Sequence, residues 1–332
     1  MNKKILHIGG TYNQITQLHK IALELPEYDH FFSPQYCDGI LNIMQKLGWL
    51  DFTAPGRPWV KRIRKYILFQ QLNLDYGGIA GPYDLTLITS DLIVPKNIRK
   101  GKVILVQEGM TDPENAAYHL VKLFPFLPMW IASSSTNGLS DLYDIFCVAS
   151  EGYRDFFIEK GVRQEKIIVT GIPNFDNCRK FLRNRFPLKG YVLVCTSDSR
   201  ETFKIENRAH FIRRAFEIAH GRQLVFKLHP NENVVRATKE IETYAPGALI
   251  FANGPVEQMI ANCSVLITQY SSVVYIGIAL DKEVYSYFDV NELRRLLPLQ
   301  HHSAAKNIAR VCRQLLEDDL CEIPLPSLEL AS

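Results

Sequence analysis

Short runs of valine, isoleucine and leucine alternate with amphipathic stretches along this chain, and the alternation restricts the folds open to it. The runs have the length of strands and lack polar alternation, so we expect parallel sheets that helices cover on both faces. A first set of strands is predicted at Ile5–Ile8, Asp84–Thr89, Lys102–Val106, Ile145–Val148 and Ile167–Thr170. A second set is predicted at Tyr191–Cys195, Gln223–Leu228, Ala248–Phe251 and Ser264–Thr268.

The stretches between these strands have helical spacing of their apolar residues. They predict helices at Gln14–Leu25, Glu151–Lys160, Lys204–His220, Val234–Tyr244, Val256–Ala261 and Ser272–Leu280. Between the two sets, residues 171–190 combine glycine, proline and a basic run with little strand signal. We therefore predict an α/β protein with two Rossmann-like domains, 1–185 and 186–332, that face each other across a cleft. The last predicted helix, Ala304–Leu316, can cross back onto the first domain.

Composition excludes several classes of protein. Hydrophobic residues make up 47% of the chain, which is enough apolar surface to exclude general disorder. A net charge of only +3 argues against a nucleic-acid partner, because such proteins usually carry a strong basic excess. The 7 cysteines are widely spaced and form no CxxC pair, so we expect neither a disulfide framework nor a metal site.

The N-terminal apolar run stops at Gly9, too early for a secretory signal, and no apolar stretch approaches the ~20 residues that span a bilayer. We expect a cytoplasmic protein, at most at the inner membrane surface. Two segments bear on that surface: Trp59–Phe69 reads as a basic helix with an apolar face, and Tyr118–Ile131 is dense in aromatic residues. Two interpretations stay open: both segments pack on the first domain, or they contact a membrane or a lipid-linked acceptor.

Ligands of open parallel sheets bind beyond the carboxyl ends of the strands, so each predicted strand end is a candidate site. After the first strand come Gly9, Gly10 and Thr11, where glycine lets the backbone approach a ligand closely and a helix begins. The full GxGxxG pattern is missing, so a dinucleotide site is weakly supported. The alternative is a tight turn that lines the cleft without binding anything.

Gln107-Glu108-Gly109 follows the strand Lys102–Val106. A carboxylate directly after a buried strand is costly unless it is used or paired. Glu108 is therefore a candidate general base, or a carboxylate that faces a developing cation, with Gln107 and Gly109 beside it. The alternative is that Glu108 caps a neighbouring helix or pairs with a lysine.

His229-Pro230 ends a strand of the second set, and the proline restricts the turn that follows. A histidine there can donate to a phosphate or a leaving group, although a structural histidine is the alternative. Ser271-Ser272 follows another strand and precedes a predicted helix, a setting in which hydroxyls and backbone N–H groups can hold phosphate. The alternative for Ser271 is a plain N-cap.

Two further strand ends give weaker signals. The backbone at Asn253 and Gly254 could contact a nucleotide base, and Glu257 could contact a ribose. Gly171 and Asn174 follow the strand that ends the first set, so they would line the cleft or serve only as a hinge.

In this order, Gln107-Glu108-Gly109, His229-Pro230 and Ser271-Ser272 resemble the acidic-acidic-Gly, His-Pro and Ser-Ser/Thr motifs of bacterial sialyltransferases and Kdo transferases. Gln107 stands where that motif has its first acidic residue. These enzymes of capsule and lipopolysaccharide assembly belong to a wider GT-B glycosyltransferase group that includes CDP-glycerol glycerophosphotransferases. The segment Ala149–Pro173 is similar to the same group and to UDP-GlcNAc 2-epimerases, and the resemblance spans residues 80–290.

The resemblance implies a glycosyltransferase that moves a sugar from a nucleotide-activated donor, with a CMP-sugar favoured, to a surface glycan or lipid-linked acceptor. It implies no cofactor and no catalytic metal. Glu108 and His229 would be catalytic, with His229 and the two serines on the donor phosphate, the acceptor on residues 1–185 and the donor on 186–332.

Three alternatives stay open: a CDP-glycerol-type glycerophosphotransferase, an enzyme like UDP-GlcNAc 2-epimerase, and a non-catalytic protein that binds nucleotide sugars or glycan machinery. A second active-centre histidine would favour the glycerophosphotransferase, and His7 and His19 are available for that role.

Overall fold

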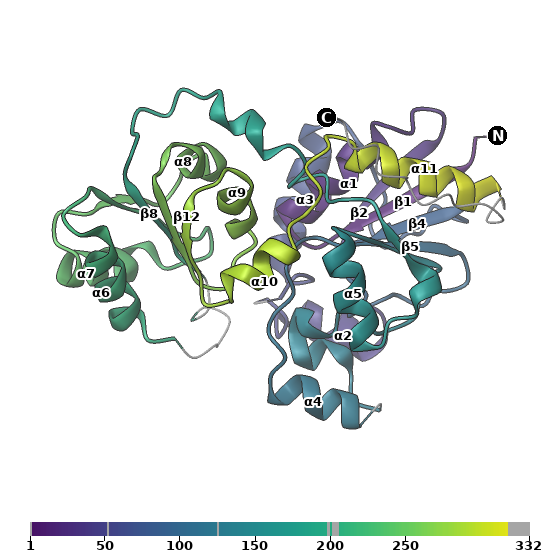
Figure 1. Ribbon diagram of the computed structural model, residues 1–332. Coiled ribbons are helices and arrows are strands. Elements are labelled where there is room, and N and C mark those ends of the chain that lie inside the picture. The colour runs from purple at the N-terminus through teal and green to yellow at the C-terminus, as the bar shows by residue number, and fades with distance from the viewer. Residues whose placement is uncertain (1, 52, 125, 198–199, 201–205, 318–332) are drawn as a thin grey trace. The chain divides into compact units, whose positions relative to one another are not determined.

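The computed structural model describes all residues except 1, 52, 125, 198–199, 201–205 and 318–332. The described residues divide into two compact units (Figure 1). Unit 1 runs up to Asp176 and takes in the residues from His301 onward, whereas unit 2 is Asn177–Gln300. Each unit has one parallel sheet with helices around it, so the predicted α/β class with two Rossmann-like sheets is confirmed.

The sheet of unit 1 has seven parallel strands in the order β3-β2-β1-β4-β5-β6-β7. The strands are β1 (Lys4–Gly9), β2 (Asp29–Pro34), β3 (Asn73–Leu74), β4 (Leu85–Ile88), β5 (Lys102–Val106), β6 (Ile145–Val148) and β7 (Ile167–Val169). The helices are α1 (Tyr12–Ala22), α2 (Gly39–Leu47), α3 (Arg57–Phe69), α4 (Ala116–Leu123), α5 (Glu151–Lys160) and α11 (Ala304–Glu317). Short 3-10 turns lie at Met129–Thr136 and Gln164–Lys166.

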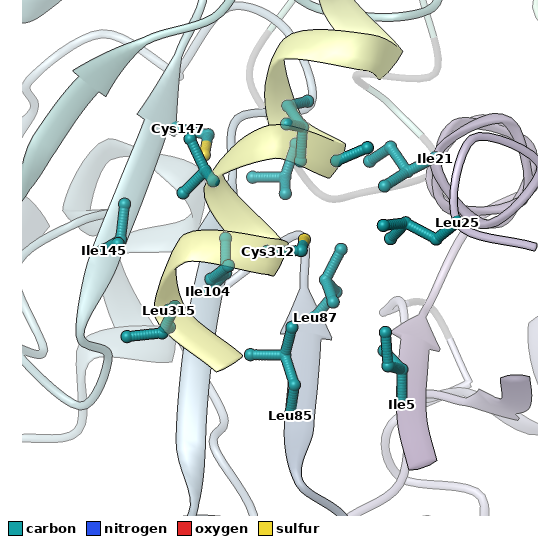
Figure 2. Packing of buried hydrophobic residues seen from close by; sticks show 14 of the residues in the cluster. Ile5, Ile21, Leu25, Leu85, Leu87, Ile104, Ile145, Cys147, Cys312 and Leu315 are labelled. Atoms are coloured by element: carbon teal, nitrogen blue, oxygen red, sulfur yellow. The ribbon is translucent and has the colours of Figure 1, made fainter. Parts of the chain in front are cut away.

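Helix α11 completes the core of unit 1. Figure 2 shows Cys312 and Leu315 of α11 packed with Leu87 of β4 and Ile104 of β5, all of them buried. The carboxylate of Asp176 accepts the backbone N–H groups of His302 and of Ala304, the latter at 2.7 Å, and so holds the start of α11. The C-terminal helix therefore belongs to the first unit.

The sheet of unit 2 has five parallel strands in the order β10-β9-β8-β11-β12. The strands are β8 (Val192–Cys195), β9 (Leu224–Lys227), β10 (Leu249–Phe251), β11 (Val265–Thr268) and β12 (Glu283–Tyr285). The helices are α6 (Arg208–Ala219), α7 (Val234–Tyr244), α8 (Val256–Asn262), α9 (Val274–Ala279) and α10 (Val290–Arg295). The predicted helix start at Lys204 lies outside the described residues.

The division of the chain falls after Asp176, so the boundary drawn near residue 185 from the sequence lies inside unit 2. The reason is the short helix Cys178–Leu182, which packs against α8 and α9. Asn184 adds a hydrogen bond at 3.0 Å to Asn262 at the end of α8. The segment with the basic run after Asp176 is thus part of unit 2 and not a free linker.

Among the residues that the structure describes, no helix is both long enough and apolar enough to cross a membrane.

Candidate functional site

The carboxylate of Glu108 lies at the carboxyl end of β5, held by side chains from the start of α1. Its Oε1 accepts from Thr11 Oγ1 at 3.1 Å and from Asn13 Nδ2 at 3.3 Å. Its Oε2 accepts from Gln14 Nε2 at 2.6 Å. All three donors are neutral, and Glu108 stays half-buried rather than sealed in the core. The alternative of a lysine partner has no support in these contacts.

Gln14 connects Glu108 to the loop after β1. The side-chain amide oxygen of Gln14, Oε1, accepts the backbone N–H of Gly10 at 2.6 Å and that of Thr11 at 3.2 Å. Thr11 is also the N-cap of α1, because its hydroxyl accepts the Gln14 N–H at 3.2 Å. A Cβ atom on Gly10 would lie 2.8 Å from the Cβ of Ala54, so only glycine fits this turn. The predicted Gly9–Thr11 loop therefore lies beside Glu108.

Gln107 has a different role from Glu108, because its side chain turns inward and is buried. Its amide nitrogen donates to the carbonyl of Gly109 at 2.8 Å, and its amide oxygen accepts the N–H of Ala149 at 2.8 Å. A carboxylate could not make the first of these bonds, since it has no proton to donate. Gln107 thus links the ends of β5 and β6 and leaves Glu108 as the one carboxylate of the motif.

Asn174 belongs to the same network. Its Nδ2 donates to Asn13 Oδ1 at 2.6 Å, and its Oδ1 accepts from Lys20 Nζ at 2.6 Å. Gly171, three residues earlier in the chain, adopts a φ of 83°, which lets the backbone turn away from β7 toward this position. The structure therefore brings together Thr11, Glu108 and Asn174 from three strand ends of unit 1.

In unit 2, His229 lies just beyond β9, half-buried, with Pro230 exposed after it. Its backbone N–H donates to Thr196 Oγ1 at 3.0 Å, and its Nδ1 accepts the N–H of Asn231 at 3.3 Å. In the neutral imidazole this places the proton on Nε2. The turn thus leaves Nε2 as the donor nitrogen of the ring.

A cluster of buried polar side chains contacts the turn that contains His229. The carboxylate of Glu232 accepts from the Thr196 hydroxyl and pairs with the Arg208 guanidinium. Arg208 also lies 3.1 Å from Glu206, whose carboxylate accepts from Gln269 Nε2 at 2.8 Å. Burial of ionised side chains is tolerated here because they are paired. The cluster ties together the segments that follow β8, β9 and β11.

Ser271 and Ser272 lie in a turn after β11, and the structure corrects their predicted helical setting. Helix α9 begins at Val274 with Val273 as its N-cap, so neither serine caps a helix by its side chain. Their carbonyl oxygens accept the N–H groups of Val274 at 3.2 Å and of Tyr275 at 3.1 Å. Both serines are half-buried in the turn between β11 and α9, and their role in holding phosphate stays a prediction.

Asn253 and Gly254 are exposed at the carboxyl end of the edge strand β10, and Glu257 is in the first turn of α8. Burial lowers the pKa of Lys227, and the negative charge of the nearby Glu257 carboxylate opposes this shift. Lys227 donates to the carbonyl oxygens of Leu228 at 2.7 Å and Ala252 at 3.2 Å. These contacts steady the loop but point to no ligand by themselves.

His7 and His19 are engaged inside unit 1. His7 is fully buried within β1, where its Nε2 lies 2.9 Å from His30 Nδ1, and its ring stacks on Phe32. His19 Nδ1 lies 2.8 Å from the hydroxyl of Tyr66. Neither ring is at a strand end, so the feature that would favour a glycerophosphotransferase is not supplied by these two residues.

Several residues of both groups were missed from the sequence. Asn13 and Gln14 come just after the predicted Gly9–Thr11 loop, so the same strand end points to them, whereas Lys20 lies further along α1, where helical amphipathicity hides its role. Thr196 and Ser197 directly follow β8, so a systematic reading of strand ends could have found them. Ser197 Oγ donates to Gln269 Oε1 at 2.7 Å. Within the described residues, no group of three or more His, Cys, Asp or Glu side chains could hold a metal ion.

No family model and no curated protein matches this chain. Solved structures match it over nearly its whole length. UDP-GlcNAc 2-epimerase from Neisseria meningitidis, bound to UDP-GlcNAc, is 13% identical with a TM-score of 0.57, covering 94% of this chain and 100% of that one. A variant of the wall teichoic acid polymerase TagF, soaked with CDPG, is 11% identical with a TM-score of 0.53, covering 96% and 89%.

A putative UDP-N-acetylglucosamine 2-epimerase from Listeria monocytogenes is 14% identical with a TM-score of 0.54, covering 96% of this chain and 89% of that one. At such identities the likeness shows the fold alone. It agrees with the two parallel sheets described above and assigns the chain the two-unit GT-B fold.

Proposed function

We propose that the chain is a glycosyltransferase that moves a sugar from a nucleotide-activated donor to a surface glycan or lipid-linked acceptor. The observation that carries the proposal is the carboxylate of Glu108, held at a strand end by Thr11, Asn13 and Gln14. Neutral donors orient a carboxylate without cancelling its charge, which suits a group that must act on a proton or a cationic centre.

Glu108 would accept the proton of an acceptor hydroxyl as that oxygen attacks the anomeric carbon, or it would stabilise the oxocarbenium-like centre that forms there. The carboxylate can meet a substrate because it is only half-buried. Three hydrogen bonds limit its rotation, so its orientation is set before the acceptor arrives.

The donor would bind unit 2. The Nε2–H of His229 would donate to the phosphate, and the serines Ser271 and Ser272 would add hydroxyl donors. These donors would stabilise the negative charge that develops on the leaving nucleotide. Contact of Asn253 and Gly254 with the nucleotide base, and of Glu257 with the ribose, stays a prediction.

The similar structures keep two rival activities in view. One similar structure is a UDP-GlcNAc 2-epimerase and another is a putative UDP-N-acetylglucosamine 2-epimerase. A third is a variant of a wall teichoic acid polymerase soaked with CDPG. The contacts of His7 with His30 and of His19 with Tyr66 count against the glycerophosphotransferase, and the incubation without acceptor described below separates sugar transfer from epimerisation. A non-catalytic binding protein would have no need to hold Glu108 so tightly.

Thermal-shift measurements against CMP, CDP, UDP, GDP and their sugars test the donor, because a ligand of the folded state raises the melting temperature by mass action. A CMP-sugar is the expected donor. The accepted donor is then incubated with glycan and lipid-linked acceptors, and also alone. A change of sugar stereochemistry without acceptor would assign an epimerase, transfer of glycerol phosphate from CDP-glycerol a glycerophosphotransferase, and binding without turnover a non-catalytic protein.

We expect the reaction in the cytoplasm at the inner membrane surface, with no cofactor and no metal. The same turnover in the presence and absence of a chelator would agree with a metal-independent enzyme.

A further inference from the structure

Helix α2 exposes three apolar side chains on one face and buries a polar side chain. Ile40, Ile43 and Leu47 have the three- and four-residue spacing of one helix face, and they are 77%, 59% and 58% exposed. On the buried side, Gln45 donates to the carbonyl of Pro55 at 2.6 Å. Trp49, two residues after the helix, is 65% exposed. Exposed apolar side chains that gather on one helix face are typical of an interaction surface.

This face lies near the carboxyl ends of the strands in unit 1, where Glu108 is also found. Helix α2 follows β2, whose last residue, Pro34, pairs with Gly9 of β1. The N–H of Gln35 donates to the Gly9 carbonyl at 3.0 Å, and Ala54 of the α2–α3 loop packs against Gly10. The chain segments on both sides of α2 therefore touch the loop that contacts Glu108 through Gln14.

The neighbouring helix α3 is strongly basic. It contains Arg57, Lys61, Arg62, Arg64 and Lys65 and no acidic residue. All five side chains are exposed, and Lys46 of α2 is exposed as well. The Arg57 guanidinium packs over Gly48 at the end of α2 and pairs with Asp51 at 2.5 Å, which joins the two helices.

We propose that Ile40, Ile43, Leu47 and Trp49, together with the basic side chains of α3, dock on the surface of an anionic lipid bilayer. We call this set the α2–α3 face. Protruding apolar side chains can enter the fluid boundary of a bilayer, whereas a folded partner would need a matching hollow for each. The basic side chains complement anionic headgroups, and tryptophan favours the interface.

The biological role of this docking rests on the proposed function. A lipid-linked acceptor is anchored in a bilayer, so a docked α2–α3 face would present the acceptor headgroup to the sheet edge at Glu108. Of the two segments that the sequence offered for membrane contact, the α2–α3 face includes the basic helix Trp59–Phe69 and leaves out the aromatic segment, of which Leu123 and Phe126 are 71% and 80% exposed.

Flotation of the full chain with lipid vesicles tests the proposal. Vesicles of phosphatidylcholine alone are compared with an equimolar mixture of phosphatidylcholine and phosphatidylglycerol, without any nucleotide. We expect the wild-type chain to bind the mixed vesicles. The double variant Ile40→Ser with Ile43→Ser should lower the affinity for these vesicles by at least about tenfold. Lys61→Gln and Lys65→Gln should each lower it by about fivefold. The matched controls are Val235→Ser and Lys239→Gln in unit 2, also exposed, which should change nothing.

Melting temperature and the nucleotide thermal shift are measured on every variant, so loss of folding is recognised. Lost vesicle binding with both readouts intact supports the proposal. It is overturned if the wild-type chain ignores vesicles, if the α2 and α3 variants bind like the wild type, or if only Leu123→Ser with Phe126→Ser loses binding. A wild-type chain that shifts with nucleotide but ignores vesicles leaves the proposed function standing, and vesicle binding without any nucleotide shift leaves only the docking surface.

Discussion

Gln14 Nε2 lies 2.6 Å from Glu108 Oε2, across 94 positions of sequence. The same amide group accepts the N–H of Gly10 through its oxygen at 2.6 Å. One buried side chain therefore fixes both the carboxylate proposed for catalysis and the glycine loop beside it. Thr11 and Asn13 donate to the other oxygen of Glu108, so side chains at the start of α1 contact both carboxylate oxygens.

Glu108→Gln should lower turnover by roughly 10²-fold, chiefly in kcat, because the lost proton acceptor or charge acts in the transition state. One oxygen that now accepts a hydrogen bond becomes an NH₂ group, so we expect a loss of about 1 kcal/mol in the free energy of unfolding. Turnover per folded molecule and urea unfolding are measured on one preparation. Glu165→Gln, whose side chain is 72% exposed, is the control. A destabilised but fully active variant would remove Glu108 from the site.

Gln14→Ala should lower kcat while donor affinity stays unchanged, because it frees Glu108 to rotate and the residues proposed to bind the donor all belong to unit 2. It also leaves the N–H of Gly10 without the partner it has now, which should cost about 1–3 kcal/mol in the free energy of unfolding. Steady-state kinetics and urea titration separate the two effects. Gln164→Ala, at an exposed position, serves as the control. Unchanged kcat alongside lost stability would make Gln14 purely structural.

His229→Ala should weaken nucleotide binding by about 10–100-fold, the scale of a hydrogen bond to a charged group. The melting temperature without ligand should change little, because the side chain is half-buried and the turn is also held through its backbone N–H. Calorimetric titration of the nucleotide gives the affinity. His210→Ala on the exposed side of α6 is the matched control. Equal affinities for wild type and His229→Ala would leave His229 with a structural role only.

Unit 1 should lose stability as the solution is acidified through the range where histidine titrates. Burial, followed by the charges of His30 and His19, lowers the pKa of His7 well below its ordinary value of 6.5. The folded state then binds fewer protons than the unfolded state, so this contribution is fully present above 6.5 and is lost as the pH falls below it. The loss can reach about 1.4 kcal/mol per pH unit for one group.

Urea titrations at about pH 7.5 and about pH 5.5 measure this slope, since unperturbed carboxylates stay ionised over that range. His7→Gln should flatten the slope relative to the wild type, and His210→Gln at an exposed position should leave it unchanged. An identical slope in all three proteins would show that His7 does not carry the pH dependence.

Most of the strands predicted from sequence are those that both faces of a sheet bury, such as β4, β5 and β8, and the edge strand β10 was predicted as well. The strands that were missed are β2, β3 and β12. Strand β3 has two residues and lies at the sheet edge, β12 is also an edge strand, and β2 begins with the exposed Asp29. Edge positions tolerate polar side chains, so β3 and β12 lack the apolar run that identifies a central strand, and β2 lacks it although it lies between β3 and β1.

The sequence by itself determined the α/β class and the strand-end positions of Glu108 and His229, because both follow from local apolar runs and chain order. Tertiary structure alone decided that Gln107 turns inward and that Gln14 holds Glu108. It also decided that α2 turns its apolar face outward. Each of these depends on which distant segment lies opposite a side chain, and helical or strand periodicity carries no information about that partner.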